Sequence, residues 1–293
     1  MNKKKYFSSH FIIFQLWAHA LRLRQATCLP VTKDLLRFAQ VFSQMIKVGL
    51  EVDIQTVKEV LNATVIEIER NQKKIEKPGI KDDPDLLQEE MENNCLTSLY
   101  LVMILTKISK KEEKAEFAAM QEVYKLVQLN PVTSTGSTLL HLTVNQQTPV
   151  GNYREKLNIH IHDLYLDDFH TNEVCKFPCS STTKLLLQAG ADPQAVDRAK
   201  NTPLHIIVTY RKVVSDFLTL HAIVMALLET GAHIDSVNAA GQTPLAAATT
   251  GVAEIILKSQ ADMSLKCLAA QSIRKYNINY IGQVCEHMNI LDL

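Results

Sequence analysis

Apolar residues recur at helical spacing through the first half of the chain. The pattern predicts helices over residues 16–47, with a turn at 28–32 and Thr32 as a cap, and over 54–74, 85–109 and 115–129. A break stands at 49–53, and an exposed loop containing Pro and Gly stands at 77–84. The alternation of apolar and polar residues that is typical of strands is missing, so we expect an all-α chain.

A short motif marks helix starts in the second half. Thr202-Pro203-Leu204-His205 returns as Thr243-Pro244-Leu245-Ala246 and, more loosely, as Thr138-Leu139-Leu140-His141. The Thr hydroxyl can cap the free N–H groups of the first turn, and Pro at the next position loses no hydrogen bond. Leu then begins the buried face, and we expect the His side chain to bond back toward the capping turn.

A second motif stands before two of these helix starts. Gly190 and Gly231 each follow an apolar helix ending in a pair of Leu, as a C-terminal stop does. A turn, a capped helix, a second helix and a Gly stop together make the ankyrin unit. Thr202 and Thr243 are 41 positions apart, more than the ~33 residues of a standard unit. We therefore expect a solenoid with insertions near 151–177 and 210–217.

Composition and charge narrow the class of protein. The 31 basic and 31 acidic residues balance, which does not favour a surface for nucleic acid or anionic membrane. No apolar run approaches the ~20 residues of a membrane span. The six Cys are scattered, as in the reducing cytoplasm or nucleus. The basic and apolar start, residues 3–20, imitates a secretory signal, but an amphipathic helix at a domain edge explains it as well.

Two groups of residues invite a chemical interpretation. A metal site in the long insertion would draw on His160, His162, Asp163, His170, Cys175 and Cys179. Their spacing matches no established zinc pattern, and a solvated loop is the alternative. His141 and His205 stand where His serves the fold, and no nucleophile elbow, Walker loop or His-Glu-x-x-His motif occurs. We expect no catalysis, no metal and no cofactor.

The C-terminal stretch carries a helical stripe. Leu265, Ala269 and Ile273 are spaced at i, i+4 and i+8, and Ser264 can cap the helix that they predict. The small Ala269 would let another helix approach closely, with Leu265 as an anchor. The spacing alone leaves two interpretations open, a docking helix for a partner or a helix that closes the repeat stack.

Four stretches together resemble one known family, the Fem (feminization) protein homologues. They are residues 34–45, 168–175, 215–221 and 263–270. The resemblance runs from about residue 16 to 283, and it implies a non-catalytic substrate receptor of a cullin-RING ubiquitin ligase. In such proteins a long N-terminal ankyrin array binds the C-terminal degron of the substrate, and no stretch of this chain matches that array. The insertion at 153–166 also has no counterpart in the family.

The resemblance also implies partners and binding residues. Family members bind the elongin B–elongin C pair through a box of the form Ser/Thr/Pro-Leu-x-x-x-Cys/Ser/Ala-x-x-x-apolar. Ser264, Leu265, Ala269 and Ile273 match this box, and Leu268 flanks the stripe as a further binding residue. A cullin-2 motif, apolar-Pro-x-x-apolar, should follow, and its counterparts are Val284, Cys285 and Met288, with Cys285 in place of Pro. The alternative function is an ankyrin scaffold without a ligase role.

These patterns divide the chain into four parts. Residues 1–14 match nothing in the family, and 15–130 form a helical region similar to tetratricopeptide repeats. About three ankyrin repeats with insertions span 131–262. The elongin-binding box and an incomplete cullin box occupy 263–293.

Overall fold

The chain is all-α over the part that the computed structural model describes, residues 16–17, 19–27, 31–47, 49–79, 82–109, 113–149, 175–211 and 216–259. Residues 16–17 and 19–26 are helical. The helices that follow are α2 (Thr32–Lys47), α3 (Ile54–Glu76), α4 (Pro84–Ser109), α5 (Glu113–Gln128), α6 (Leu139–Val144), α8 (Ser180–Gln188), α9 (Pro203–Ile207), α10 (Phe217–Glu229), α11 (Pro244–Ala247) and α12 (Gly251–Ser259). Among the described residues, β pairing is limited to an isolated antiparallel bridge between Val132 and Thr138. The predicted all-α class is confirmed.

Local signals explain most helix boundaries. Asp53 caps α3, because its Oδ2 accepts a hydrogen bond of 2.8 Å from the N–H of Thr56. The prediction that Thr32 caps α2 is wrong, because Thr32 is the first residue inside that helix. The carbonyl of Val31 accepts the first helical hydrogen bond, 2.9 Å from Leu35 N, so the helix begins one residue earlier than the sequence suggested.

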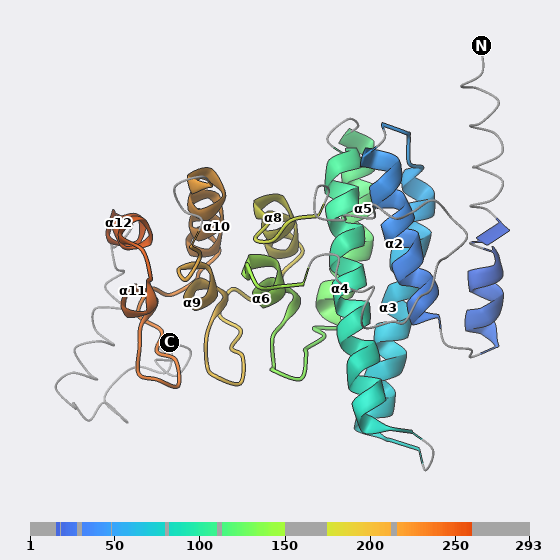
Figure 1. Ribbon diagram of the computed structural model, residues 1–293, viewed down its shortest axis with the longest axis horizontal. Helices are drawn as coiled ribbons and strands as arrows, with labels where there is room; N and C mark the ends of the chain where they lie inside the picture. The colour runs from blue at the N-terminus through green and yellow to red at the C-terminus, as the bar shows by residue number, and fades with distance from the viewer. Residues whose placement is uncertain are drawn as a thin grey trace, which may run out of the picture.

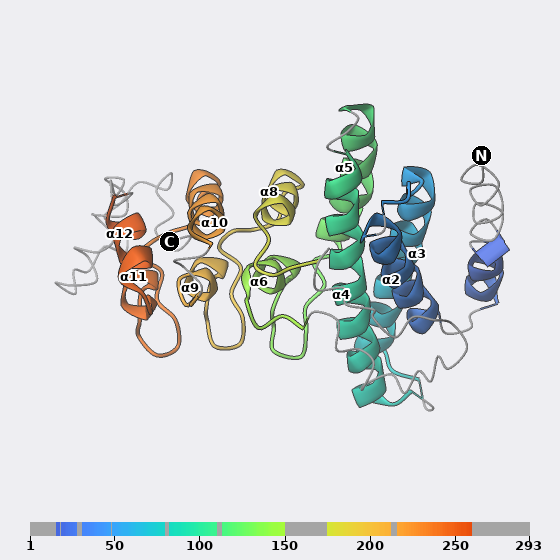
Figure 2. The ribbon, with the colours of Figure 1, turned by 45° about the horizontal axis from the view of Figure 1, so that its top comes forward.

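Helix α4 is the centre of the helical half. It packs against α2, α3 and α5, and its middle is buried on all sides from Leu99 to Leu105. A helix that is apolar all round needs partners on every face. Figure 2 shows α4 standing between the α2–α3 pair and the rest of the molecule, where it also contacts α6 and α8.

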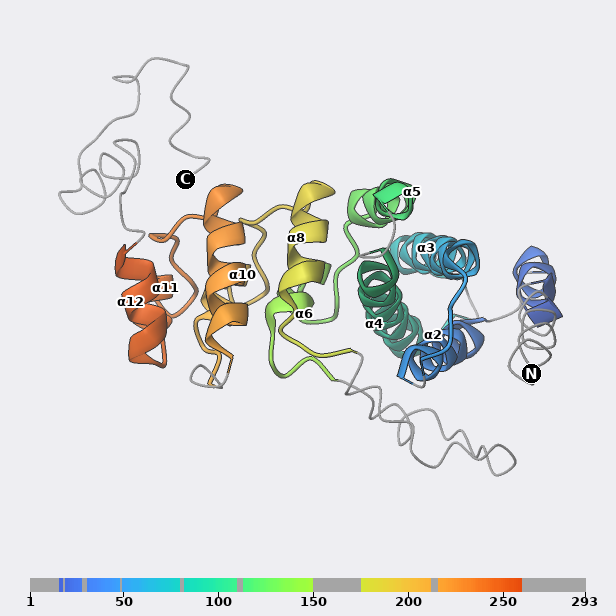
Figure 3. The ribbon, with the colours of Figure 1, turned by 90° about the horizontal axis from the view of Figure 1, so that it is seen from above.

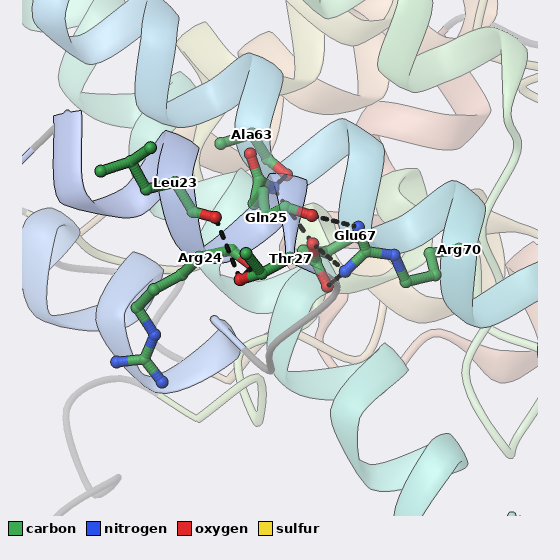
Figure 4. A network of polar contacts seen from close by, with 7 residues as sticks. All are labelled: Leu23, Arg24, Gln25, Thr27, Ala63, Glu67 and Arg70. Atoms are coloured by element: carbon green, nitrogen blue, oxygen red, sulfur yellow. Dashed lines mark hydrogen bonds and ion pairs between the residues drawn. The ribbon is translucent and has the colours of Figure 1, made fainter.

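A buried polar network fixes the first helical residues, 19–26, onto α3. Glu67 accepts two hydrogen bonds from Arg70, of 2.9 and 3.2 Å, and one of 3.1 Å from Gln25 Nε2. Gln25 also donates to the carbonyl of Ala63, and Arg70 Nη2 donates to the carbonyl of Gln25 (Figure 4). Nearby, the ring of Trp17 meets that of Phe38 edge-on at 5.9 Å.

The second half is a row of helix pairs. Helix α6 packs on α8, α9 on α10 and α11 on α12, and each pair packs on the next (Figures 1 and 3). We call these pairs, each with the turn before its first helix, units 1, 2 and 3. The turns project to the same side of the row (Figure 1). The predicted Gly stops are confirmed, since Gly190 and Gly231 follow α8 and α10 at φ of 91° and 104°.

Candidate protein-interaction surface

The Thr-x-x-His motif closes the first turn of units 1 and 2. The N–H of Thr202 donates to His205 Nδ1 at 3.2 Å, and the N–H of His205 donates to Thr202 Oγ1 at 3.4 Å. Thr138 and His141 make the same reciprocal pair. This capping box satisfies two main-chain donors that a helix start would otherwise leave free. The prediction that His bonds back to the capping turn is confirmed.

The same His side chains also join neighbouring units. Because Nδ1 accepts a main-chain N–H, the neutral ring carries its proton on Nε2. His141 Nε2 donates to the carbonyl of Asn201 at 2.8 Å, and His205 Nε2 donates to the carbonyl of Gln242 at 3.0 Å. Burial lowers the pKa of both His side chains, which keeps them in this neutral form.

Main-chain hydrogen bonds connect the projecting turns side by side. Arg198 N donates to the carbonyl of Thr135 at 2.9 Å, and Ala239 N donates to that of Ala199 at 2.8 Å. The side chain of Asn238 donates to Asn201 Oδ1 at 2.9 Å. The turns of the three units are therefore one connected surface rather than separate loops.

Gly136 is needed where the first two turns meet. It has φ of 76°, and a Cβ there would lie 3.0 Å from Arg198 N and 3.2 Å from Arg198 Cγ. Gly241 has nearly the same φ, 75°, with nothing within 4 Å of its Cβ position. We expect Gly136→Ala to lower the free energy of unfolding by about 2 kcal/mol and Gly241→Ala by about 1 kcal/mol. Urea denaturation of both variants measures this, and equal losses would contradict a close approach at Gly136.

The stack is anchored on the helical half through α4. Glu92 Oε1 accepts hydrogen bonds from the N–H of Ser134, at 2.9 Å, and from its hydroxyl. Elsewhere at the junction, Tyr100 donates to the carbonyl of Pro149 at 2.6 Å. These bonds fix unit 1 against the helical half, the first at its turn and the second after α6.

The far end of the stack lacks a cover among the described residues. Leu245 of unit 3 is 37% exposed, whereas its counterpart Leu204 in unit 2 is fully buried. Ile255 is 68% exposed, whereas its counterpart Leu185 in unit 1 is 7% exposed. Ala246 replaces the bridging His, so its side chain has no donor for a further unit. We call the surface of Leu245, Ala246 and Ile255 the end face.

The binding residues predicted from the family resemblance lie outside the described residues. They are Ser264, Leu265, Leu268, Ala269 and Ile273 of the elongin-binding box and Val284, Cys285 and Met288 of the cullin motif. The described chain stops at Ser259, directly after the end face, so the box follows the end face in sequence.

The candidate metal ligands lie partly inside and partly outside the described residues. His160, His162, Asp163 and His170 lie outside the described residues. Cys175 is buried with its Sγ 3.8 Å from Ser43 Oγ, and burial raises the pKa of its thiol to about 11. Cys179 is half-buried, with its Sγ 3.3 Å from Thr182 Oγ1. Among the described residues, no group of three His, Cys, Asp or Glu is placed to hold a metal ion.

No helix in the described ranges is long and apolar enough to cross a bilayer. The chain matches no family model.

Individual relatives match almost the whole chain. It is 29% identical over 286 residues to Protein fem-1 homolog C of Xenopus laevis, covering 93% of the chain and 40% of that protein. It is 30% identical over 288 residues to Protein fem-1 homolog A of Danio rerio, covering 94% and 41%, and 30% identical over 287 residues to Protein fem-1 homolog C of Homo sapiens, covering 93% and 40%. The chain thus spans about two-fifths of the length of these relatives. Along nearly its whole length, the chain is therefore similar to a part of the Fem-1 homologues.

Proposed function

We propose that the chain is a non-catalytic adaptor of a cullin-2 RING ubiquitin ligase that docks on the elongin B–elongin C pair. The similarity of nearly the whole chain to Fem-1 homologues carries this proposal. In this role the chain transfers no group itself, because its task is to hold a degron-bearing substrate protein near the ubiquitin-conjugating enzyme. With the elongin pair and cullin-2 as partners, the chain would act in the cytoplasm or the nucleus.

The repeat architecture supports the proposal. We interpret units 1 to 3 as ankyrin repeats within 131–262, and the helical half, 15–130, as similar to tetratricopeptide repeats. Ser264 follows Ser259, the last residue of α12, by five positions. The elongin-binding box would therefore be attached closely to the end of the stack. A short connection of this kind limits the orientations that the docked partners can take.

Docking would use a helix in a groove. Leu265, Ala269 and Ile273 would form the binding stripe, with Leu268 beside it and Ser264 as the helix cap. Leu265 would be the main anchor, since burying one Leu side chain is worth about 1.5–3 kcal/mol.

Recruitment of cullin-2 would be weaker than in similar proteins. Val284 and Met288 supply the two apolar positions of the motif, but Cys285 stands where Pro is expected. We therefore propose elongin docking as the principal interaction and a low affinity for cullin-2.

Leu265→Asp is expected to weaken binding of the elongin B–elongin C pair at least about tenfold, because a charge would replace the anchor of the stripe. Calorimetry of the purified chain with the elongin pair measures the effect. Gln271→Asp is the matched control, because at helical spacing it adds the same charge away from the stripe. An unchanged affinity of Leu265→Asp would contradict elongin docking through this stripe.

The end face favours one rival function, an ankyrin scaffold without a ligase role. Exposed Leu245 and Ile255 need a cover, and the stretch 264–273 could supply it as a capping helix. In that case Leu265→Asp would lower the thermal midpoint of the chain, and the folded wild-type chain would not bind the elongin pair. Calorimetry and thermal melting of the same two proteins distinguish the functions.

A further inference from the structure

Each unit of the stack exposes a valine at the same place. Val132, Val196 and Val237 each stand six positions before the Thr that caps the first helix of the unit. They are 43%, 54% and 45% exposed, so the core of the stack does not account for them. We call these residues the valine row.

The valine row lies on a surface that is ordered before any partner arrives. Each of the three turns is closed by a main-chain hydrogen bond of 3.0 Å, such as that from Asp197 N to the carbonyl of Asn201. The turns are bonded to one another through Arg198 N to Thr135 O and Ala239 N to Ala199 O. A preordered surface loses little conformational entropy on binding, which favours affinity.

The residues around the row favour an extended peptide over a bulky element. Ala199, Ala239 and Ala240 in the turns are exposed, and their small side chains leave room for a peptide main chain to approach. Packed helices lie about 8–10 Å apart, so the row spans roughly 20 Å. An extended chain covers that length in about six residues.

Two exposed cations near Val196 can pair with an acidic partner. Arg198 and Lys200, close to Val196 in sequence, are exposed, and in the described part of the chain neither forms an ion pair. The two carboxylates of the same loop form hydrogen bonds to neutral donors rather than to these cations. Asp197 accepts from the N–H and the side chain of Asn201, at 2.8 and 3.2 Å, and Asp192 accepts from Gln194 N at 2.8 Å.

We propose that the valine row, with Arg198 and Lys200 beside it, is a docking surface for an extended acidic peptide segment of a partner protein. The valines take apolar side chains of the peptide, and the two cations pair with its carboxylates. The surface lies on the turns and does not involve residues 264–273, so it is independent of elongin docking.

A display library of random peptides of about twelve residues, long enough to cross the row, tests the proposal on the full chain. We expect the selected peptides to be rich in Val, Leu or Ile together with Asp or Glu. Fluorescence anisotropy of the most enriched peptide gives its Kd. Val196→Ser and Arg198→Glu should each weaken binding about tenfold, the first by loss of apolar area and the second by charge reversal.

Leu218→Ser is the matched control, because Leu218 on α10 is 79% exposed and lies outside the turns. It should leave the Kd unchanged, and circular dichroism melting should show all three variants folded, since each changes an exposed side chain. Selection of no peptide, selection of basic peptides, or equal Kd values for Val196→Ser and Leu218→Ser would overturn the proposal. If Val196→Ser does not fold, Arg198→Glu decides alone.

Discussion

Arg70→Met is expected to lower the free energy of unfolding by about 3 kcal/mol. The variant leaves the carboxylate of Glu67, with 5% of its side chain exposed, without the two hydrogen bonds from the guanidinium. Removing one partner of a buried ion pair typically costs about 3–5 kcal/mol, and Arg70 is 24% exposed, which places the effect at the low end. The substitution also removes the hydrogen bond from Arg70 to the carbonyl of Gln25, which holds residues 19–26 against α3.

Lys73→Met on the same helix is the matched control. It removes the Lys73–Glu69 ion pair, whose side chains are 72% and 47% exposed, and should cost less than about 0.5 kcal/mol. Urea denaturation of both variants gives the comparison. The double variant Arg70→Met with Glu67→Gln should recover part of the loss, because it no longer buries an unpaired charge. If Arg70→Met and Lys73→Met cost the same, the Glu67 network contributes little to stability.

The sequence predicted those features that depend on neighbouring residues. The capping boxes at Thr138 and Thr202 need only residues within one helical turn, and the Gly stops likewise depend on local backbone geometry. The same holds for α3, predicted over 54–74 and observed as Ile54–Glu76. Local chemistry was therefore enough to find the helices and their order.

Features that depend on distant residues were missed. His141 Nε2 meets a carbonyl 60 positions away, and Gln25 meets Glu67 42 positions away, so no local pattern indicates either bond. One signal was available for Glu67, since it stands on the apolar stripe of its helix, where a charge needs a partner. The valine row also left a signal, because aligning the three Thr residues places one valine before each at the same distance.

Leu204→Ala is expected to lower the free energy of unfolding by about 3 kcal/mol, because Leu204 is fully buried between units 1 and 3. Leu245→Ala, the same change at the matching position of unit 3, should cost less than about 1 kcal/mol, since Leu245 is 37% exposed. Urea denaturation of the full chain measures both variants.

The difference between the two variants reports on what lies against the end face. A small loss for Leu245→Ala means that the end face is open in solution, and a helix at 264–273 is then free to dock on a partner through its stripe. A loss equal to that of Leu204→Ala would contradict the expected exposure and show that Leu245 is covered in solution. Repeating the measurement with Leu265→Asp then identifies the cover, because a capping helix anchored by Leu265 makes the two substitutions non-additive. Additive losses would assign the cover to another segment and leave the stripe to the elongin pair.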